Sequence, residues 1–242
     1  MNALDRTRHA DASLAGRLVV ALAGCAMVLT LAGCPWLYNP DIDPSDFVAS
    51  ITNPLLALVP GTTFLYEATT PEGLQRIEVA VTQDTKEILG VTCTVVRDSV
   101  TLDGQLIEDT RDWYAQDSAG NVWYFGEDSK SYEGGVVVST EGSWEAGVDG
   151  AKPGIVMEAD PQVGDTYRQE YLRGVAEDMA TVVGLGESAT VPYDSFDNCL
   201  KTKDFSRLDP GVVEYKFYAP GVGQILTLDG DVREELVSKS VS

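Results

Sequence analysis

The chain is poor in positive charge and nearly devoid of histidine. Its 242 residues include 17 Lys and Arg against 38 Asp and Glu, which gives a formal net charge of -21. Nucleic-acid binding depends on clustered basic side chains that contact phosphates, so this balance excludes a nucleic-acid partner. The same deficit argues against polybasic attachment to anionic lipid.

The one histidine, His9, precedes a segment that we expect to be removed. Its loss excludes catalysis of the Ser-His-Asp and Cys-His types, and zinc or copper sites that depend on imidazole. A metal would have to be a hard cation bound by oxygen atoms, such as calcium. Asp41, Asp43 and Asp46 have the spacing that opens a calcium loop, but no glycine stands at the sixth position and Thr52 stands at the twelfth. The sequence therefore predicts no metal site and no cofactor, and only a calcium site assembled from separate strands stays open as an alternative.

An uncharged apolar run covers residues 18–33, after a mildly basic start. A transmembrane helix needs about 20 such residues, so the run is short for a membrane span, although it is longer than the apolar region of a typical secretory signal. It ends in Leu31-Ala32-Gly33-Cys34, which resembles the lipobox of bacterial lipoproteins. This resemblance implies that residues 1–33 are a signal peptide and that Cys34 becomes a lipidated N-terminus, with palmitate among its acyl chains. The lipid would anchor the chain in a bacterial membrane outside the cytoplasm, at the periplasmic face or the cell surface.

Two alternatives place the attachment differently. Leu22-Ala23-Gly24-Cys25 repeats the four letters, but cleavage there would leave an apolar run of only seven residues, Leu18 to Gly24. The second alternative is an uncleaved N-terminal anchor helix. We favour Cys34, and each alternative still leaves the rest of the chain outside the cytoplasm.

Two further cysteines, Cys93 and Cys199, follow the lipobox. In an oxidising compartment a pair of thiols predicts one disulfide. Closing a loop of about 105 residues would stabilise the fold by about 4–5 kcal/mol in the chain-entropy model. The alternative is two separate buried thiols that pack as small apolar groups.

The mature chain divides into a proline-rich tether, residues 34–60, and a β domain, residues 61–242. In the domain, Ile77, Val79 and Val81 alternate with other residues, and an apolar Val213-Tyr215-Phe217 set alternates with Glu214 and Lys216. Such alternation is typical of antiparallel strands with one dry face. Turn signals separate about ten to twelve expected strands. A sheet of this size must curl, so we predict an all-β fold with few short helices, a large curved antiparallel sheet forming a barrel or half-barrel.

Carboxylates and aromatic rings are concentrated in residues 108–117 and 121–128. Strand alternation places Glu108, Asp112 and Tyr114 on one face and Trp113 on the other. Such a face could bind a sugar or an apolar ligand; the alternative is an aromatic core with ordinary surface charges. The candidate ligand-binding residues are Glu108, Asp112, Trp113, Tyr114, Trp123, Tyr124 and Glu127.

Several segments together resemble a family of uncharacterised bacterial secreted proteins and lipoproteins. The family implies no activity that could be transferred to this chain, and the sequence identifies no catalytic residue. A lipidated antiparallel chain is also similar, at the level of fold, to the curved half-barrels of lipoprotein carriers. The segments that carry the family resemblance are Asn53-Pro54, Pro60-Gly61-Thr62-Thr63, Asp112-Trp113-Tyr114-Ala115-Gln116-Asp117, Asn121-Val122-Trp123-Tyr124-Phe125-Gly126-Glu127, Gly142-Ser143-Trp144-Glu145-Ala146-Gly147 and Tyr218-Ala219-Pro220-Gly221-Val222-Gly223.

The sequence thus predicts a non-enzymatic envelope lipoprotein whose β domain binds an apolar or small ligand, or a protein partner. Two alternatives remain open. One is a hydrolase that acts on envelope glycans through carboxylates, and the other is a purely structural envelope lipoprotein.

Overall fold

The structure, a computed structural model, describes residues 38–242. The predictions that concern the signal peptide and the two candidate lipidation sites, Cys25 and Cys34, lie outside the described residues. Among residues 38–242, no helix combines the length and the apolar character that a membrane crossing requires.

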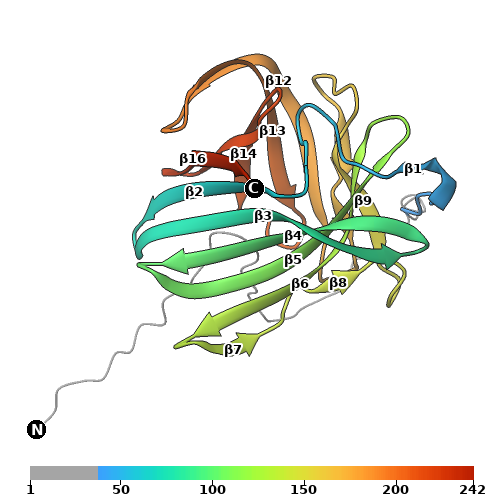
Figure 1. Cartoon of the computed structure of the whole chain (residues 1–242), viewed down its shortest axis with the longest axis horizontal. Helices are drawn as coiled ribbons and strands as arrows, with labels where there is room; N and C mark the ends of the chain where they lie inside the picture. The colour runs from blue at the N-terminus through green and yellow to red at the C-terminus, as the bar shows by residue number, and fades with distance from the viewer. Residues whose placement is uncertain (1–37) are drawn as a thin grey trace, which may run out of the picture.

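The described chain is built almost entirely from antiparallel strands (Figure 1). Its one 3-10 helix, η1 (Pro44–Asp46), begins after Asp43, whose carboxylate accepts a hydrogen bond from the Ser45 backbone N–H at 2.9 Å. The strands are β1 (Phe47–Val48), β2 (Thr62–Thr70), β3 (Gly73–Ile88), β4 (Val91–Leu102), β5 (Gln105–Asp117), β6 (Val122–Glu133), β7 (Val136–Ser139), β8 (Trp144–Glu145), β9 (Lys152–Met157), β10 (Thr166–Arg168), β11 (Glu170–Tyr171), β12 (Asp178–Thr190), β13 (Ser195–Ser206), β14 (Val213–Ala219), β15 (Gly223–Asp229) and β16 (Val232–Val241).

These strands form one curved sheet in the order β10-β12-β13-β14-β15-β16-β2-β3-β4-β5-β6-β9-β11, with β1, β7 and β8 added at its margins. Most neighbours are consecutive hairpins, as the turn signals predict. Among the non-consecutive pairings, the last strand, β16, pairs with β2, which joins the two ends of the β domain. The predicted all-β antiparallel fold, curled towards a barrel, is confirmed.

One short segment brings the two edges of the sheet together. β10 pairs with β12 at one edge and β11 pairs with β9 at the other, and Gln169 alone separates them. Gly154 on β9 makes this junction possible, because a Cβ there would overlap the backbone of Arg168 and Gln169. The glycine thus allows the strand to cross close to the junction.

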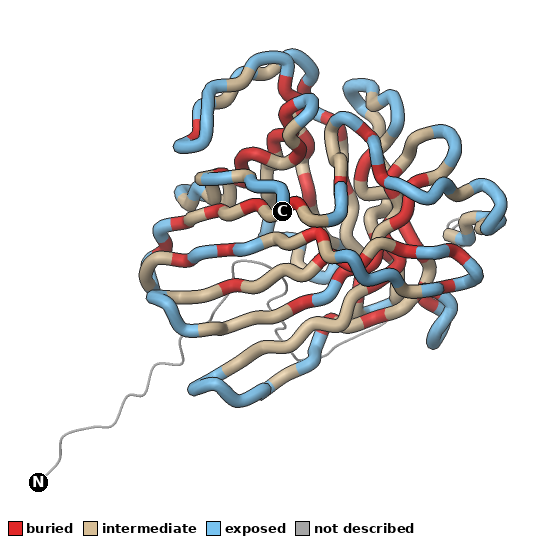
Figure 2. Tube along the Cα trace, viewed as in Figure 1, coloured by how far each residue is buried: buried red, intermediate tan, exposed pale blue. Residues whose placement is uncertain are grey.

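Buried residues alternate with more exposed ones along the strands (Figure 2). In β2 the burial pattern alternates strictly, with Phe64, Tyr66 and Ala68 buried. Both faces of β14 are covered. Phe217 is buried in the main core, as the alternation predicts, and lies with Tyr215 beneath Lys201. Glu214 and Lys216, which the alternation placed on a wet face, line the cavity instead.

The segment before β2 covers one end of the barrel. The side chains of Ile51 and Leu58 are buried in the main core. The Asn53 side-chain amide donates to the carbonyls of Gly120 and Glu158, which follow β5 and β9. These contacts fix residues 51–58 across the strand ends, so this part of the predicted tether packs against the domain.

The predicted Cys93–Cys199 disulfide is wrong for this structure, because both cysteines are free, buried thiols. They belong to separate apolar clusters. Cys199 lies in the main core, and Cys93 lies in a second, smaller cluster with Trp113, Phe125 and Trp144. Burial raises the pKa of the Cys93 thiol to about 12. The alternative to the disulfide, two separate buried thiols that pack as small apolar groups, describes these cysteines.

Candidate functional site: a cavity inside the barrel

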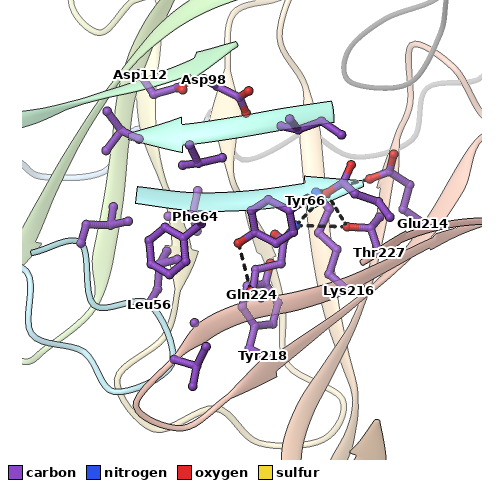
Figure 3. A pocket seen from close by; sticks show the side chains of 18 of the residues that line it. Leu56, Phe64, Tyr66, Asp98, Asp112, Glu214, Lys216, Tyr218, Gln224 and Thr227 are labelled. Atoms are coloured by element: carbon purple, nitrogen blue, oxygen red, sulfur yellow. Dashed lines mark hydrogen bonds and ion pairs between the residues drawn. The ribbon is translucent and has the colours of Figure 1, made fainter. Parts of the chain in front are cut away.

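A cavity of about 290 Å³ lies inside the barrel (Figure 3). Its apolar surface comes from the covering segment, through Leu56 and Leu58, and from Phe64, Val79 and Val96 on β2 to β4. Its polar surface comes mainly from β4, β5 and β14 to β16. The polar and tyrosine side chains that line it are Tyr66, Asp98, Asp112, Tyr114, Gln169, Glu214, Lys216, Tyr218, Gln224, Thr227, Asp229 and Glu234.

A tyrosine that touches two carboxylates organises one wall. The Tyr124 hydroxyl lies 2.6 Å from Asp112 Oδ1 and 3.1 Å from Glu127 Oε2. It has one hydrogen to donate, so it cannot satisfy both carboxylates at full strength. Its ring stacks on Tyr114 with centroids 4.8 Å apart. The arrangement favours a proton on one of the two carboxyl groups.

A β-bulge makes this wall possible. Trp113 pairs with Gly126 and Tyr114 pairs with Tyr124, so Phe125 has no partner across β5. The extra residue turns Tyr124 and Glu127, three positions apart, towards the same side. Gly126 supports the bulge with a φ of +134°, and a Cβ there would overlap the Trp144 carbonyl oxygen.

Asp98 is the least satisfied carboxylate at the cavity. Its Oδ1 atom is buried and has no hydrogen-bond partner within the described chain. The pKa of Asp98 is raised well above its usual range, first by burial and then by the charges of Asp112, Glu234 and other nearby carboxylates. A buried carboxylate oxygen without a hydrogen-bond partner is costly, so this atom needs a proton or a positive partner.

Lys216 neutralises a different part of the interior. Its Nζ lies 3.2 Å from Asp204 Oδ2 and 3.3 Å from Glu214 Oε2. Burial alone would lower the pKa of Lys216, but these two carboxylates more than offset it and raise that pKa well above its usual value. Asp204 is further held by hydrogen bonds from Thr202 and Gln169. This lysine is therefore engaged as a fixed ammonium.

Burial also raises the pKa values of two further cavity carboxyls. The pKa of Asp112 rises to about 7, with the Tyr124 hydrogen bond acting in the opposite direction and Glu108 and Glu170 adding to the rise. The pKa of Glu234 also rises to about 7, since burial outweighs the attraction of Lys216. The carboxyl groups of Asp112 and Glu234 consequently exchange protons near neutral pH.

Five of the seven predicted ligand-binding residues gather at this interior. Asp112 and Tyr114 line the cavity, Tyr124 and Glu127 form the wall beside them, and Glu108 is close enough to raise the pKa of Asp112.

The two predicted tryptophans lie elsewhere. Trp113 belongs to the smaller cluster that contains Cys93, with Lys86 Nζ 3.4 Å from its ring centroid. The Trp123 indole N–H donates to Asp117 at 2.8 Å, and its ring packs edge-on against Phe47. Neither lines the cavity.

Sequence reasoning missed the contributions of Asp98 and of the C-terminal strands. Glu214 and Lys216 alternate with apolar residues, which predicts a wet face for them, and Glu234 stands in a charged run, Arg233-Glu234-Glu235, that gives no sign of an interior position. Both faces of a strand in a barrel can be covered. Alternation alone therefore does not identify the face that lines the barrel interior. No group of three or more His, Cys, Asp or Glu side chains within residues 38–242 is arranged to hold a metal ion.

Comparison with known proteins adds two weak structural similarities. No protein-family model matches the chain, and no curated protein matches its sequence. A Bacteroides fragilis protein described as exported, with a YmcC-like fold, is 14% identical with a TM-score of 0.43, over 78% of this chain and 100% of that one. A Parabacteroides distasonis protein described as a lipoprotein is 12% identical with a TM-score of 0.41, over 77% of this chain and 98% of that one. Similarity at this level does not establish a shared function.

Proposed function

We propose that the chain is a lipid-anchored protein of the bacterial envelope whose barrel binds a small, partly apolar ligand without catalysing a reaction. The observation that carries the proposal is the cavity of about 290 Å³ enclosed by the curved sheet. Small-molecule sites are concave, with apolar walls and a few polar groups that orient the ligand. This cavity combines Phe64 and five valines with tyrosine hydroxyls and carboxylates.

The size of the cavity favours ligand binding over glycan hydrolysis. It has the volume of about ten water molecules, which suits a ligand of about ten non-hydrogen atoms. An enzyme that hydrolyses a glycan polymer needs two carboxylates on either side of a cleft that the polymer can enter. Asp112 is 8% exposed and lies on an inner wall, with its oxygen bonded to Tyr124. The carboxylates of Asp112 and Glu127 are therefore better placed to bind a small ligand than to hydrolyse a polymer.

The position of Tyr38 supports a short connection to the membrane. Its hydroxyl donates to the Pro153 carbonyl at 2.9 Å, and its ring lies against Tyr171 and the Arg168 guanidinium. The four residue steps from Cys34 to Tyr38 span at most about 14 Å. A lipid on Cys34 would therefore hold the β9–β11 side of the barrel close to the bilayer.

Metabolic labelling with a palmitate analogue tests the anchor. We expect Cys34→Ala to abolish the label and Cys25→Ala to retain it. Label that survives Cys34→Ala and disappears in Cys25→Ala would move the anchor to the earlier cysteine.

Native mass spectrometry of the protein purified from its own envelope tests the ligand. We expect a one-to-one adduct that Val79→Phe displaces, because the larger side chain fills the cavity. Ala80→Phe is the matched control, since it adds the same ring to the neighbouring position on the other face of β3. If the two folded variants keep the same adduct, or if the native protein carries none, the proposal fails and a structural role gains support.

A further inference from the structure

The charges around the cavity do not balance. Five carboxylate side chains line it, and Lys216 is the one Lys or Arg that lines it within the described chain. Lys216 is held by Glu214 and by Asp204, which lies behind the lining. Asp98, Asp112 and Glu234 have no ion pair with a cation among residues 38–242, although burial makes their negative charge costly.

The contacts of these three carboxyls differ in strength. Asp112 accepts a short hydrogen bond from Tyr124. Glu234 receives long ones from Gln224 and Thr227, at 3.5 Å and 3.4 Å. Asp98 Oδ1 is buried and receives none. Asp98 is therefore the acceptor at the cavity with the most to gain from a bound donor.

Aromatic rings surround the same space. Phe64, Tyr66, Tyr114 and Tyr218 all line the cavity, and Figure 3 shows Phe64 and Tyr66 on β2 beneath Asp98. Aromatic rings attract cations, and the attraction grows when water is excluded. Carboxylates beside aromatic rings thus form an environment that favours a buried positive charge over a neutral or a negative one.

From this arrangement we infer that the cavity binds a small cationic amphiphile, an alkyl or arylalkyl amine whose ammonium group meets Asp98 and whose apolar body contacts Phe64 and the valines. The inference rests on the proposed function of the cavity and names its ligand class. The ammonium supplies the donors that Asp98 lacks, and the charge offsets the excess of carboxylates. A carboxylate ligand would add a further negative charge to the same space.

Titration calorimetry with three probes of equal chain length tests the inference. The protein is the whole chain from residue 34 onward with Cys34→Ser, which carries no lipid, and the probes are octylamine, octanol and octanoate. We expect octylamine to bind at least about tenfold more tightly than octanol, and octanoate most weakly. If octanol or octanoate binds as well as the amine, the inference falls and the proposed function stands. If none of the three binds, both fall.

Two matched variants locate the ammonium. Asp98→Asn keeps the shape of the side chain and breaks no hydrogen bond of Oδ1, and it should weaken octylamine binding at least about tenfold while octanol binding changes less than about twofold. Glu78→Gln removes the same charge from the exposed face of β3, and it should change neither affinity by more than about twofold. Equal losses for octylamine in both variants, or losses for both probes in Asp98→Asn, would overturn the assignment of Asp98.

Discussion

Replacing Asp112 by asparagine should stabilise the protein, and by more as the pH rises. Asp112 is 8% exposed, and burial raises its pKa from 3.8 to about 7. A folded-state pKa above the unfolded value means that the folded chain holds the extra proton. The contribution of Asp112 to the free energy of unfolding is therefore fully present below about pH 4, and it is lost as the pH rises through about 7. A shift of three units corresponds to about 4 kcal/mol lost by about pH 8.

Asparagine removes this titration and keeps an oxygen that can accept the Tyr124 hydrogen bond. We therefore expect Asp112→Asn to be close to wild type near pH 4 and more stable by up to about 4 kcal/mol near pH 8. Urea unfolding followed by tryptophan fluorescence measures both chains across this range. The difference between them reports the titration of Asp112 together with its effect on the pKa of Asp98.

Two results for Asp112→Asn would refute the argument from buried charge. If Asp112→Asn lowers stability by the same amount at every pH, the side chain acts through packing and hydrogen bonds alone, and the argument from buried charge is refuted. A difference that grows towards acid pH would also refute it, because it would mean a lowered pKa in the folded state.

Three further predictions follow from the packing. Gly126→Ala places a Cβ against the Trp144 carbonyl and should lower the free energy of unfolding by about 2 kcal/mol or more, measured by urea unfolding; a neutral effect would contradict the bulge geometry. In the chain without residues 1–34, Cys93 and Cys199 should resist alkylation when folded and both react in urea without reductant, as intact mass would show; two protected thiols in urea would restore the disulfide. Tyr38→Phe removes one hydrogen bond to β9 and should cost about 1 kcal/mol, and an unchanged unfolding curve would mean that this contact contributes nothing.

The sequence predicted the fold well because period-two patterning and frequent turn signals act locally. It also placed Asp112 and Tyr114 on one face, since β5 pairs with β4 in unbroken register at that point. It could not predict that Glu127 joins Tyr124, because one bulged residue reverses the alternation. A bulge depends on the backbone approach of Gly126 to a distant strand, which no local pattern encodes.

Two other limits are physical as well. The interior of a barrel can be polar. The alternation of β14 therefore did not reveal that Glu214 and Lys216 line the cavity. The separation of Cys93 from Cys199 into different clusters depends on how far the sheet curls, which spacing along the chain does not reveal.

The account depends most on the claim that the barrel interior is a ligand site. A crystal structure of the protein purified from its own envelope tests that claim most directly. We predict continuous density for one small molecule between Phe64 and Asp98, with a polar group within hydrogen-bond distance of Asp98 Oδ1. A cavity that contains only ordered water, with Asp98 hydrogen-bonded to that water, would contradict it.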